Sequence, residues 1–176
     1  MADPIEINLW QGEIAELEVD AIVIPASESL FMTGAVARAV KLRAGESVER
    51  EAVDQGPAAG GSAIVTGGGA LPAQHVIHVV GVGHDLQPDA EQLRSGYHAA
   101  FEAASRIGVR HLATVPIGAE RGVFAPGEAA AILAGVLAER QARGAWLPVA
   151  LVVVAGTRAE LSALAPVTGG LRAEPA

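Results

Sequence analysis

Short runs of apolar residues, each followed by a turn and then a helical pattern, are the feature that most constrains how this chain can fold. Residues 21–24 read Ala-Ile-Val-Ile, and Pro25 follows. The strand should end there because proline cannot donate a ladder hydrogen bond. A strand without polar alternation is covered on both faces. Such runs predict a mostly parallel sheet between two layers of helices.

The same alternation continues along the chain. We expect strands at residues 5–10, 21–24, 62–66, 73–80, 111–116 and 148–155. We expect helices at residues 33–45, 46–54, 89–107, 126–143 and 158–164. Because strands and helices alternate after the first third, the predicted class is α/β, with a sheet enclosed by helices.

The length and composition predict one domain with an aliphatic core. The chain has 176 residues, of which 51% are hydrophobic but only 3% aromatic. No internal repeat or interdomain linker interrupts it. We therefore expect a single domain over residues 1–176, with a core at about 5–165 and a flexible tail at 166–176.

Several classes of protein and site are excluded or disfavoured. Cysteine is absent, so disulfides and thiolate metal sites are excluded. No run of near 20 apolar residues could span a membrane, and the first residues do not resemble a signal peptide. We therefore expect a cytoplasmic location and no membrane contact.

The net charge limits the kind of ligand. A formal charge of −8 argues against binding of duplex nucleic acid, which needs a basic face. It does not exclude a small phosphorylated ligand, because backbone N–H groups at the start of a helix can hold a pyrophosphate.

Ligands of open α/β sheets bind outside the carboxyl ends of the strands, which directs attention to three segments. Gly12-Glu13-Ile14 follows the first strand, and Glu13 could pair with the amino edge of an adenine; a solvated turn carboxylate is the simpler explanation. The first loop, residues 33–36, reads Thr-Gly-Ala-Val and could hold an anion at a helix start. An ordinary helix capped by Thr33 is the simpler explanation.

The third segment, the second loop, covers residues 116–124 and reads Pro-Ile-Gly-Ala-Glu-Arg-Gly-Val-Phe. Its two glycines and its phenylalanine could wrap a pyrophosphate and stack on a ribose. A plain strand-to-helix connection is the alternative, but nine residues exceed a minimal connection.

The histidines do not indicate a metal site. His75 and His78 are three apart on a strand and point to opposite faces, and His84, His98 and His111 show no ligand spacing. We expect all five to be structural or on the surface. We expect neither a metal nor a cofactor.

These segments, in this order, resemble the macrodomain (Appr-1″-p processing-like, ADP-ribose-binding) family. Residues 12–14 are similar to its Gly-Asp-Ile turn, and residues 19–23, Val-Asp-Ala-Ile-Val, to its second strand. Leu-Pro-Ala at 71–73 followed by Val-Ile-His at 76–78 is similar to another family signature. The two loops lie where the family has its glycine-containing loops.

The resemblance implies a three-layer α/β/α domain with a mixed, mostly parallel sheet and a cleft for ADP-ribose. Glu13 would meet the adenine amino group, the two loops would enclose the diphosphate, and Phe124 would reach the distal ribose. The implied ligand-binding residues are Glu13, Ile14, Ser27, Thr33, Gly34, Ala35, Val36, Gly118, Ala119, Glu120, Arg121, Gly122, Val123 and Phe124.

The chain departs from the hydrolytic members at positions near the expected chemistry. Ser27 replaces a family asparagine, the first loop lacks an acidic residue, and Glu120 and Arg121 replace small residues. Some hydrolytic members use a lysine just after the first loop, so Lys41 joins Ser27 as a catalytic candidate. Lys41 has no acidic partner identifiable from the sequence, and a lysine on the surface of a helix is the alternative.

Three functions follow from the resemblance. The first is binding of ADP-ribose or an ADP-ribosylated protein, because the pattern resembles non-hydrolytic, histone-associated macrodomains. The second is hydrolysis of ADP-ribosyl groups or deacetylation of O-acetyl-ADP-ribose. The third is a divergent domain that has lost ADP-ribose and binds another nucleotide or only a protein, an alternative that Glu120 and Arg121 leave open.

Overall fold

The computed structural model describes residues 5–82, 85 and 87–169, and it contains one six-stranded sheet. The strand order is β1-β6-β5-β2-β4-β3, and every neighbouring pair is parallel except β3 with β4. The strands are β1 (Glu6–Gln11), β2 (Ala21–Pro25), β3 (Ala63–Gly67), β4 (His75–Val79), β5 (His111–Thr114) and β6 (Ala150–Ala155). The sheet is thus mixed and mostly parallel, as predicted.

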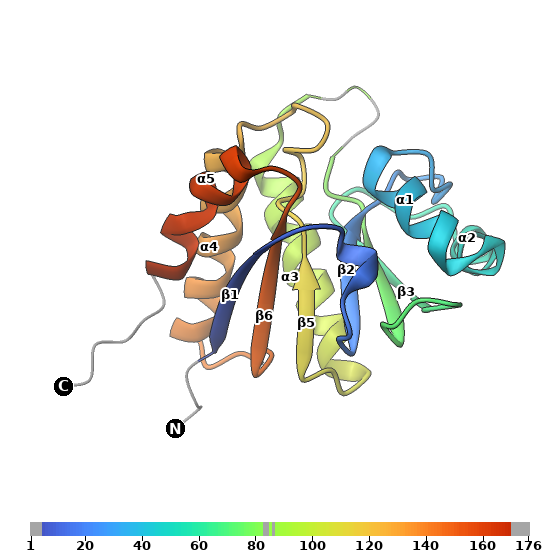
Figure 1. Ribbon diagram of the computed structural model, residues 1–176, viewed down its shortest axis with the longest axis horizontal. Helices are drawn as coiled ribbons and strands as arrows, with labels where there is room; N and C mark the ends of the chain where they lie inside the picture. Colours follow the sequence, from blue (N-terminus) through green and yellow to red (C-terminus); the bar gives the residue numbers. More distant parts are fainter. Residues whose placement is uncertain (1–4, 83–84, 86, 170–176) are drawn as a thin grey trace.

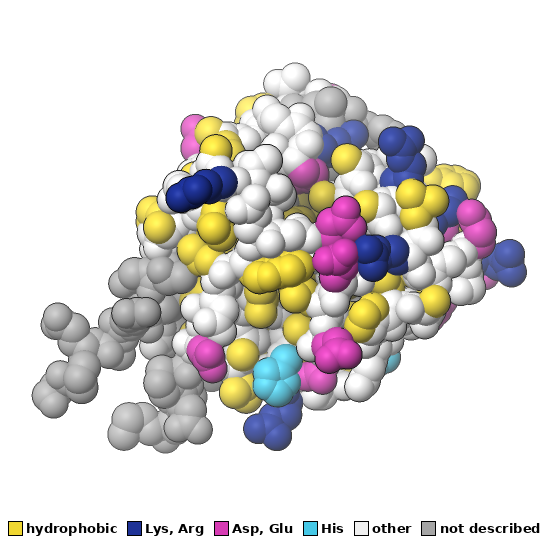
Figure 2. All heavy atoms as spheres, viewed as in Figure 1, with side chains coloured by type: hydrophobic (Ala, Val, Ile, Leu, Met, Phe, Trp, Pro, Cys, Tyr) yellow, Lys and Arg dark blue, Asp and Glu magenta, His cyan; other side chains and the backbone are white. Residues whose placement is uncertain are grey.

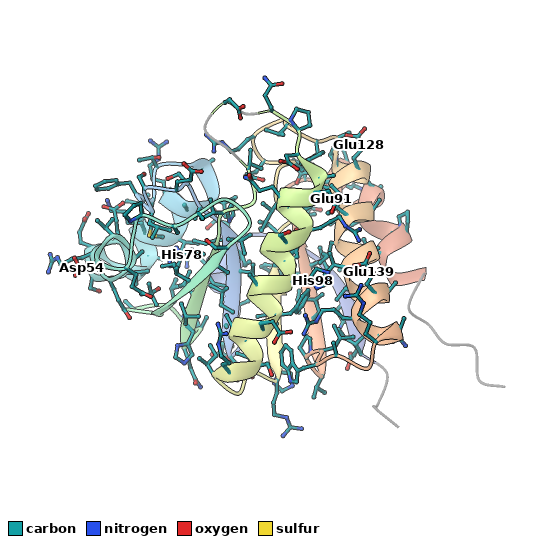
Figure 3. The ribbon with its side chains drawn as sticks, turned by 180° about the vertical axis from the view of Figure 1, so that it is seen from behind. Asp54, His78, Glu91, His98, Glu128 and Glu139 are labelled. Atoms are coloured by element: carbon teal, nitrogen blue, oxygen red, sulfur yellow. The ribbon has the colours of Figure 1, made fainter. Side chains whose placement is uncertain are left out.

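Helices cover the sheet. They are the short 3-10 helix η1 (Ile14–Glu16), α1 (Ala35–Ala44), α2 (Glu46–Asp54), α3 (Ala90–Arg106), α4 (Pro126–Ala142) and α5 (Arg158–Gly169). Helix α3 lies behind the sheet in Figure 1 and in front of it in the reverse view of Figure 3. This arrangement confirms the three-layer α/β/α prediction.

The core is aliphatic, with two large aromatic side chains of α3 inside it. In β2, Ile22 and Ile24 are completely buried, which is the reason for its unbroken apolar run. Tyr97 and Phe101 of α3 are also buried. The Tyr97 hydroxyl donates to the Val115 carbonyl at 3.2 Å and accepts from the Ile117 N–H at 3.1 Å. This helix therefore anchors the start of the second loop.

Several predicted boundaries were wrong; β4 and β6, for example, each begin two residues later than predicted. Helix α1 begins at Ala35, because Gly34 has an extended backbone conformation. The N-cap residue is therefore Gly34 and not Thr33. Strand β5 ends at Thr114, two residues before the expected end at Pro116. Helix α5 continues past Leu164 to Gly169, because Leu164 and Val167 are both buried against the core.

Residues 166–169 of the predicted tail thus belong to α5, and residues 170–176 lie outside the described part of the chain. Within the described residues, no helix combines the length and apolar character needed to cross a membrane.

Candidate functional site

Two pockets open at the carboxyl ends of the parallel strands. The first, the serine pocket, has a volume of about 300 Å³ and is lined by the β2–α1 connection, Val82 and the tip of the second loop. The second, the aliphatic pocket, has a volume of about 340 Å³. Its lining residues come from the ends of β1, β5 and β6 and from α1.

The two pockets are parts of one cleft. Both are lined by Ala35, at the start of α1, and by Glu120, in the second loop. Figure 2 shows a recess in the upper part of this face, with charged side chains at its rim. The cleft can therefore receive a ligand with two ends and a middle segment, and the middle segment would pass between Ala35 and Glu120.

The first loop presents open backbone to the cleft. Gly34 precedes α1, and no side chain of the described residues caps this helix start. A Cβ placed on Gly34 would meet no described atom within 4 Å. The first N–H groups of a helix have no partner within the helix, and their dipoles favour an anion. The start of α1 is therefore suited to hold a phosphate between the two pockets.

A salt bridge holds the segment that leads into the first loop. Glu49 of α2 accepts a hydrogen bond from the Met32 N–H at 2.8 Å and pairs with the Lys41 ammonium at 2.8 Å. Glu46 lies 3.3 Å from the same ammonium. Burial raises the pKa of Glu49, but the contacts with Lys41 and the Met32 N–H together lower it by more. The pKa of Glu49 is therefore below its usual value.

The expectation that Lys41 lacks an acidic partner was wrong. Glu46 and Glu49 follow Gly45, which turns the chain from α1 into α2 and brings both carboxylates back to Lys41. The hydrogen bond that the Lys41 ammonium donates to Glu49 raises the pKa of Lys41 despite some desolvation. A lysine held in its ammonium form is a poor nucleophile, and Lys41 lines neither pocket of the cleft.

Ser27 lies in the serine pocket beside Ser29. Their hydroxyl oxygens are 3.0 Å apart, so one donates to the other. The turn that carries them ends at Leu30, whose φ of 62° is in the left-handed region. Leu30 is buried against Ala52 and Val80, and this packing fixes the turn in a strained conformation. The two hydroxyls are therefore presented to the pocket by a rigid turn.

Hydrogen bonds within the second loop use most of its backbone N–H groups. The Gly122 N–H donates to the Ala119 carbonyl at 3.1 Å, and the Val123 and Phe124 N–H groups both donate to the Gly118 carbonyl. Gly118 has a φ of +94°, and the Phe124 ring packs directly beside its Cα. Phe124 is buried in the core and lines neither pocket, so the structure does not bring this residue into the cleft.

Glu120 occupies the junction of the two pockets. Its Oε2 accepts a hydrogen bond from the Gly118 N–H at 2.7 Å. Its Oε1 is buried and has no hydrogen-bond partner among the described residues. Burial raises the pKa of Glu120, and the N–H groups of Glu120 and Gly118 and the Arg121 charge only partly offset that increase. Glu120 thus lies beside the position where the middle of a ligand would pass.

The aliphatic pocket contains the acidic turn expected to recognise adenine. Glu13 and the buried Ile14 both line it. Glu13 lies 3.7 Å from the Arg43 guanidinium, which also binds Glu16 at 2.7 Å. The Glu13 side chain is 64% exposed, so it is accessible to a ligand at the mouth of the pocket.

A further strand-to-helix connection lies at this edge and was not among the predicted segments. Gly156 and Glu160 line the aliphatic pocket, and Glu160 accepts hydrogen bonds from the Gly156 and Thr157 N–H groups at 2.7 and 3.3 Å. The signal was present, because a buried strand followed by Gly-Thr and a helix is the arrangement that identified the first loop.

Most of the residues expected at the site do meet in the cleft. Those that line one or both pockets are Glu13, Ile14, Ser27, Thr33, Gly34, Ala35, Val36, Ala119, Glu120 and Arg121. Gly118, Gly122, Val123 and Phe124 line neither pocket and form the support of the second loop.

The described histidines have structural or surface environments. His78 is buried and lies 3.0 Å from the Thr66 hydroxyl, and burial lowers its pKa to about 4. His98 of α3 faces Glu139 of α4 at 3.2 Å on the rear of the molecule (Figure 3). His111 lies 3.6 Å from Asp20 at the far edge of the sheet. His84 lies outside the described residues, among which no group of three potential metal ligands occurs.

The fold and this cleft define an α/β/α domain that offers a strand-end site to an elongated ligand. The sequence model of the Macro domain family matches residues 23–133. The chain therefore belongs to the macrodomain family, as its motifs suggested.

Relatives and solved structures agree with this assignment. An uncharacterized protein of Mycobacterium tuberculosis is 31% identical over 166 residues, which cover 94% of this chain and 46% of that protein. ADP-ribose glycohydrolase MACROD1 of Rattus norvegicus is 38% identical over 130 residues, 72% of this chain and 50% of that protein. The Trypanosoma brucei macrodomain in complex with ADP has a TM-score of 0.85 at 22% identity, covering 93% of this chain and 69% of that one. The chain spans about half the length of the first curated relatives it matches.

Proposed function

We propose that this domain binds ADP-ribose, free or attached to a protein, in the cleft between the two loops. The observation that carries the proposal is the pair of pockets joined at Ala35, with the uncapped start of α1 between them. Adenosine would occupy the aliphatic pocket beside Glu13, and the distal ribose would occupy the serine pocket beside Ser27. The diphosphate would lie against the N–H groups that follow Gly34.

Related proteins support the choice of ligand. The Trypanosoma brucei macrodomain has been solved in complex with ADP-ribose, and it resembles this chain with a TM-score of 0.81 at 24% identity. The rat and Xenopus laevis relatives at 38% and 34% identity are ADP-ribose glycohydrolases. We propose an ADP-ribosylated protein as the partner and the cytoplasm as the location.

Calorimetry with ADP-ribose, AMP and ribose 5-phosphate tests the proposal. ADP-ribose should bind at least about tenfold more tightly than either fragment, because only the whole ligand fills both pockets. Equal affinities for ADP-ribose and AMP would contradict the use of the serine pocket. No heat with millimolar ADP-ribose would favour the third alternative, a domain that has lost this ligand.

Hydrolysis of ADP-ribosyl groups is a second candidate, favoured by the two glycohydrolase relatives and by the hydroxyl pair in the serine pocket. Incubation with a mono-ADP-ribosylated protein tests it. Release of ADP-ribose that Ser27→Ala abolishes would establish hydrolysis, and unchanged release would remove Ser27 from the reaction. Binding without release would leave recognition as the function.

A further inference from the structure

Glu120 is the residue of the cleft that the proposed ligand must move. Glu120 lines both pockets, and Ala35 is the other residue that does so. Its Oε2 accepts a hydrogen bond of 2.7 Å from the N–H of Gly118, two residues earlier in the chain. A phosphate oxygen binds a backbone N–H in the same way, so the carboxylate occupies a position suited to a ligand phosphate.

We propose that Glu120 is an internal substitute for the ligand's phosphate, which closes the middle of the cleft in the free protein and must be displaced before a diphosphate binds. This inference rests on the proposed function, because it concerns the same cleft. It makes Glu120 a determinant of specificity: a ligand without a phosphate leaves the Glu120 carboxylate in place, and a ligand with a central phosphate must displace it.

The closed position is held by few contacts. Oε1 is buried without a hydrogen-bond partner among the described residues, and a buried carboxylate oxygen without a partner is unfavourable. The neighbouring Arg121 lines the serine pocket, is exposed, and forms no salt bridge within the described part of the chain. A displaced Glu120 carboxylate therefore has an available guanidinium beside it, which would also reduce repulsion from the ligand.

The charges around Glu120 set the sign of the pH dependence. Arg121 lowers its pKa, and Glu160 at the start of α5 raises it. The Tyr97 hydroxyl, which accepts a hydrogen bond from the Ile117 N–H, stays neutral because burial raises the pKa of Tyr97. Burial dominates and leaves the pKa of Glu120 above its ordinary value. Protonation removes the charge that opposes a diphosphate, so affinity for ADP-ribose should rise as the pH falls.

Calorimetric titration of the full chain and its variants at pH 8 and pH 5.5 tests this. Glu120→Gln should bind ADP-ribose about tenfold more tightly than the unchanged protein at pH 8, and Glu120→Ala by at least as much. The difference should shrink at pH 5.5. Affinity for adenosine, which has no phosphate, should not change. Glu18→Gln removes one exposed charge away from the cleft and should match the unchanged protein.

A ligand-free measurement separates this inference from the proposed function. The Gly118 amide proton should be protected from exchange in the unchanged protein and become exchange-labile in Glu120→Ala. Equal exchange in both would overturn the inference, and so would equal ADP-ribose affinities at pH 8. ADP-ribose binding by Glu120→Ala but not by the unchanged protein would support it. Loss of Gly118 protection without ADP-ribose binding by any form would uphold Glu120 as an internal occupant and contradict only the proposed ligand.

Discussion

The two glycine-containing loops of the cleft differ in how their backbone N–H groups are used. The first loop leaves the start of α1 uncapped, and Gly34 faces open space. In the second loop, Ala119, Gly122 and Val123 donate to carbonyls of the loop itself, and Gly118 donates to Glu120. The sequence presents both as similar strand-to-helix connections. The comparison shows that a loop can bind an anion only where its backbone N–H groups have no hydrogen-bond partner within the protein. Such N–H groups lie mainly in the first loop.

The largest expected effect tests the rigidity of the second loop. In Gly118→Ala, an alanine would have to adopt a φ of +94°, which L-residues rarely adopt. Its Cβ would also lie 2.6 Å from the Phe124 ring. We expect the free energy of unfolding to fall by about 3 kcal/mol, from backbone strain and overpacking together. Gly127→Ala is the control, because its Cβ would meet no described atom within 4 Å, and it should gain up to about 1 kcal/mol. Equal denaturation midpoints for the two variants would show that the loop is not tightly packed.

The next effect tests whether the first loop holds the phosphates. Gly34→Glu places a carboxylate in open space beside the helix start, so the protein should fold normally. We expect ADP-ribose affinity to fall at least about 100-fold through repulsion of like charges. Gly34→Gln carries the same bulk without charge and should lose much less. If calorimetry gave the same affinity for both variants, charge at this position would not matter and the phosphates would lie elsewhere.

A smaller effect tests how the first loop is held. Glu49→Gln weakens the contacts to the Met32 N–H and to Lys41, and we expect unfolding to become easier by about 1–2 kcal/mol. ADP-ribose affinity should fall about fivefold to tenfold because the loop becomes less ordered. The control is Glu46→Gln: the Glu46 side chain is 75% exposed and its carboxylate lies 3.3 Å from the same ammonium, so the effect should be close to zero.

The same carboxylate predicts a pH dependence. The pKa of Glu49 in the folded protein is lower than its ordinary 4.5, so its stabilisation is present above that value. It is lost as the pH falls below 4.5 and through the folded pKa. Acid denaturation curves should therefore show less loss of stability below pH 4.5 for Glu49→Gln than for the unchanged protein. Parallel curves would contradict the assignment.

The smallest effect concerns the aliphatic pocket. Glu13 is exposed and already near Arg43, so Glu13→Gln should weaken ADP-ribose binding only about threefold. The preference for adenine over hypoxanthine in the same ligand should shrink, because the carboxylate would accept from the adenine amino group. An unchanged preference in competition titrations would place the base away from Glu13.

Much of the fold could be predicted because apolar runs and helical spacing depend on neighbouring residues alone. Residues 21–24 are buried on both faces, as their unbroken pattern indicates, and Pro126 begins α4 where the sequence placed a helix start. The family motifs also placed the two loops at one edge of the sheet. These features are local, or follow from the rule that parallel strands share a carboxyl edge.

The features that could not be predicted depend on contacts between segments whose relative positions in space do not follow from the sequence. The partners of Lys41 come from the next helix, and only the turn at Gly45 brings them near. Phe124 was expected at a ribose and packs beside Gly118 in the core, which requires the observed backbone of the second loop. Glu120 was identified as a replacement for a small residue, but its hydrogen bond with the Gly118 N–H could not be predicted from the residue types.

Amide chemical shifts during a titration with ADP-ribose test the central claim most directly. The account predicts that the Gly34, Ala35 and Val36 amides show the largest changes, and that Glu13 and Ser27, in opposite pockets, change in parallel with one affinity. Changes confined to one pocket, or none at the start of α1 with saturating ligand, would contradict it.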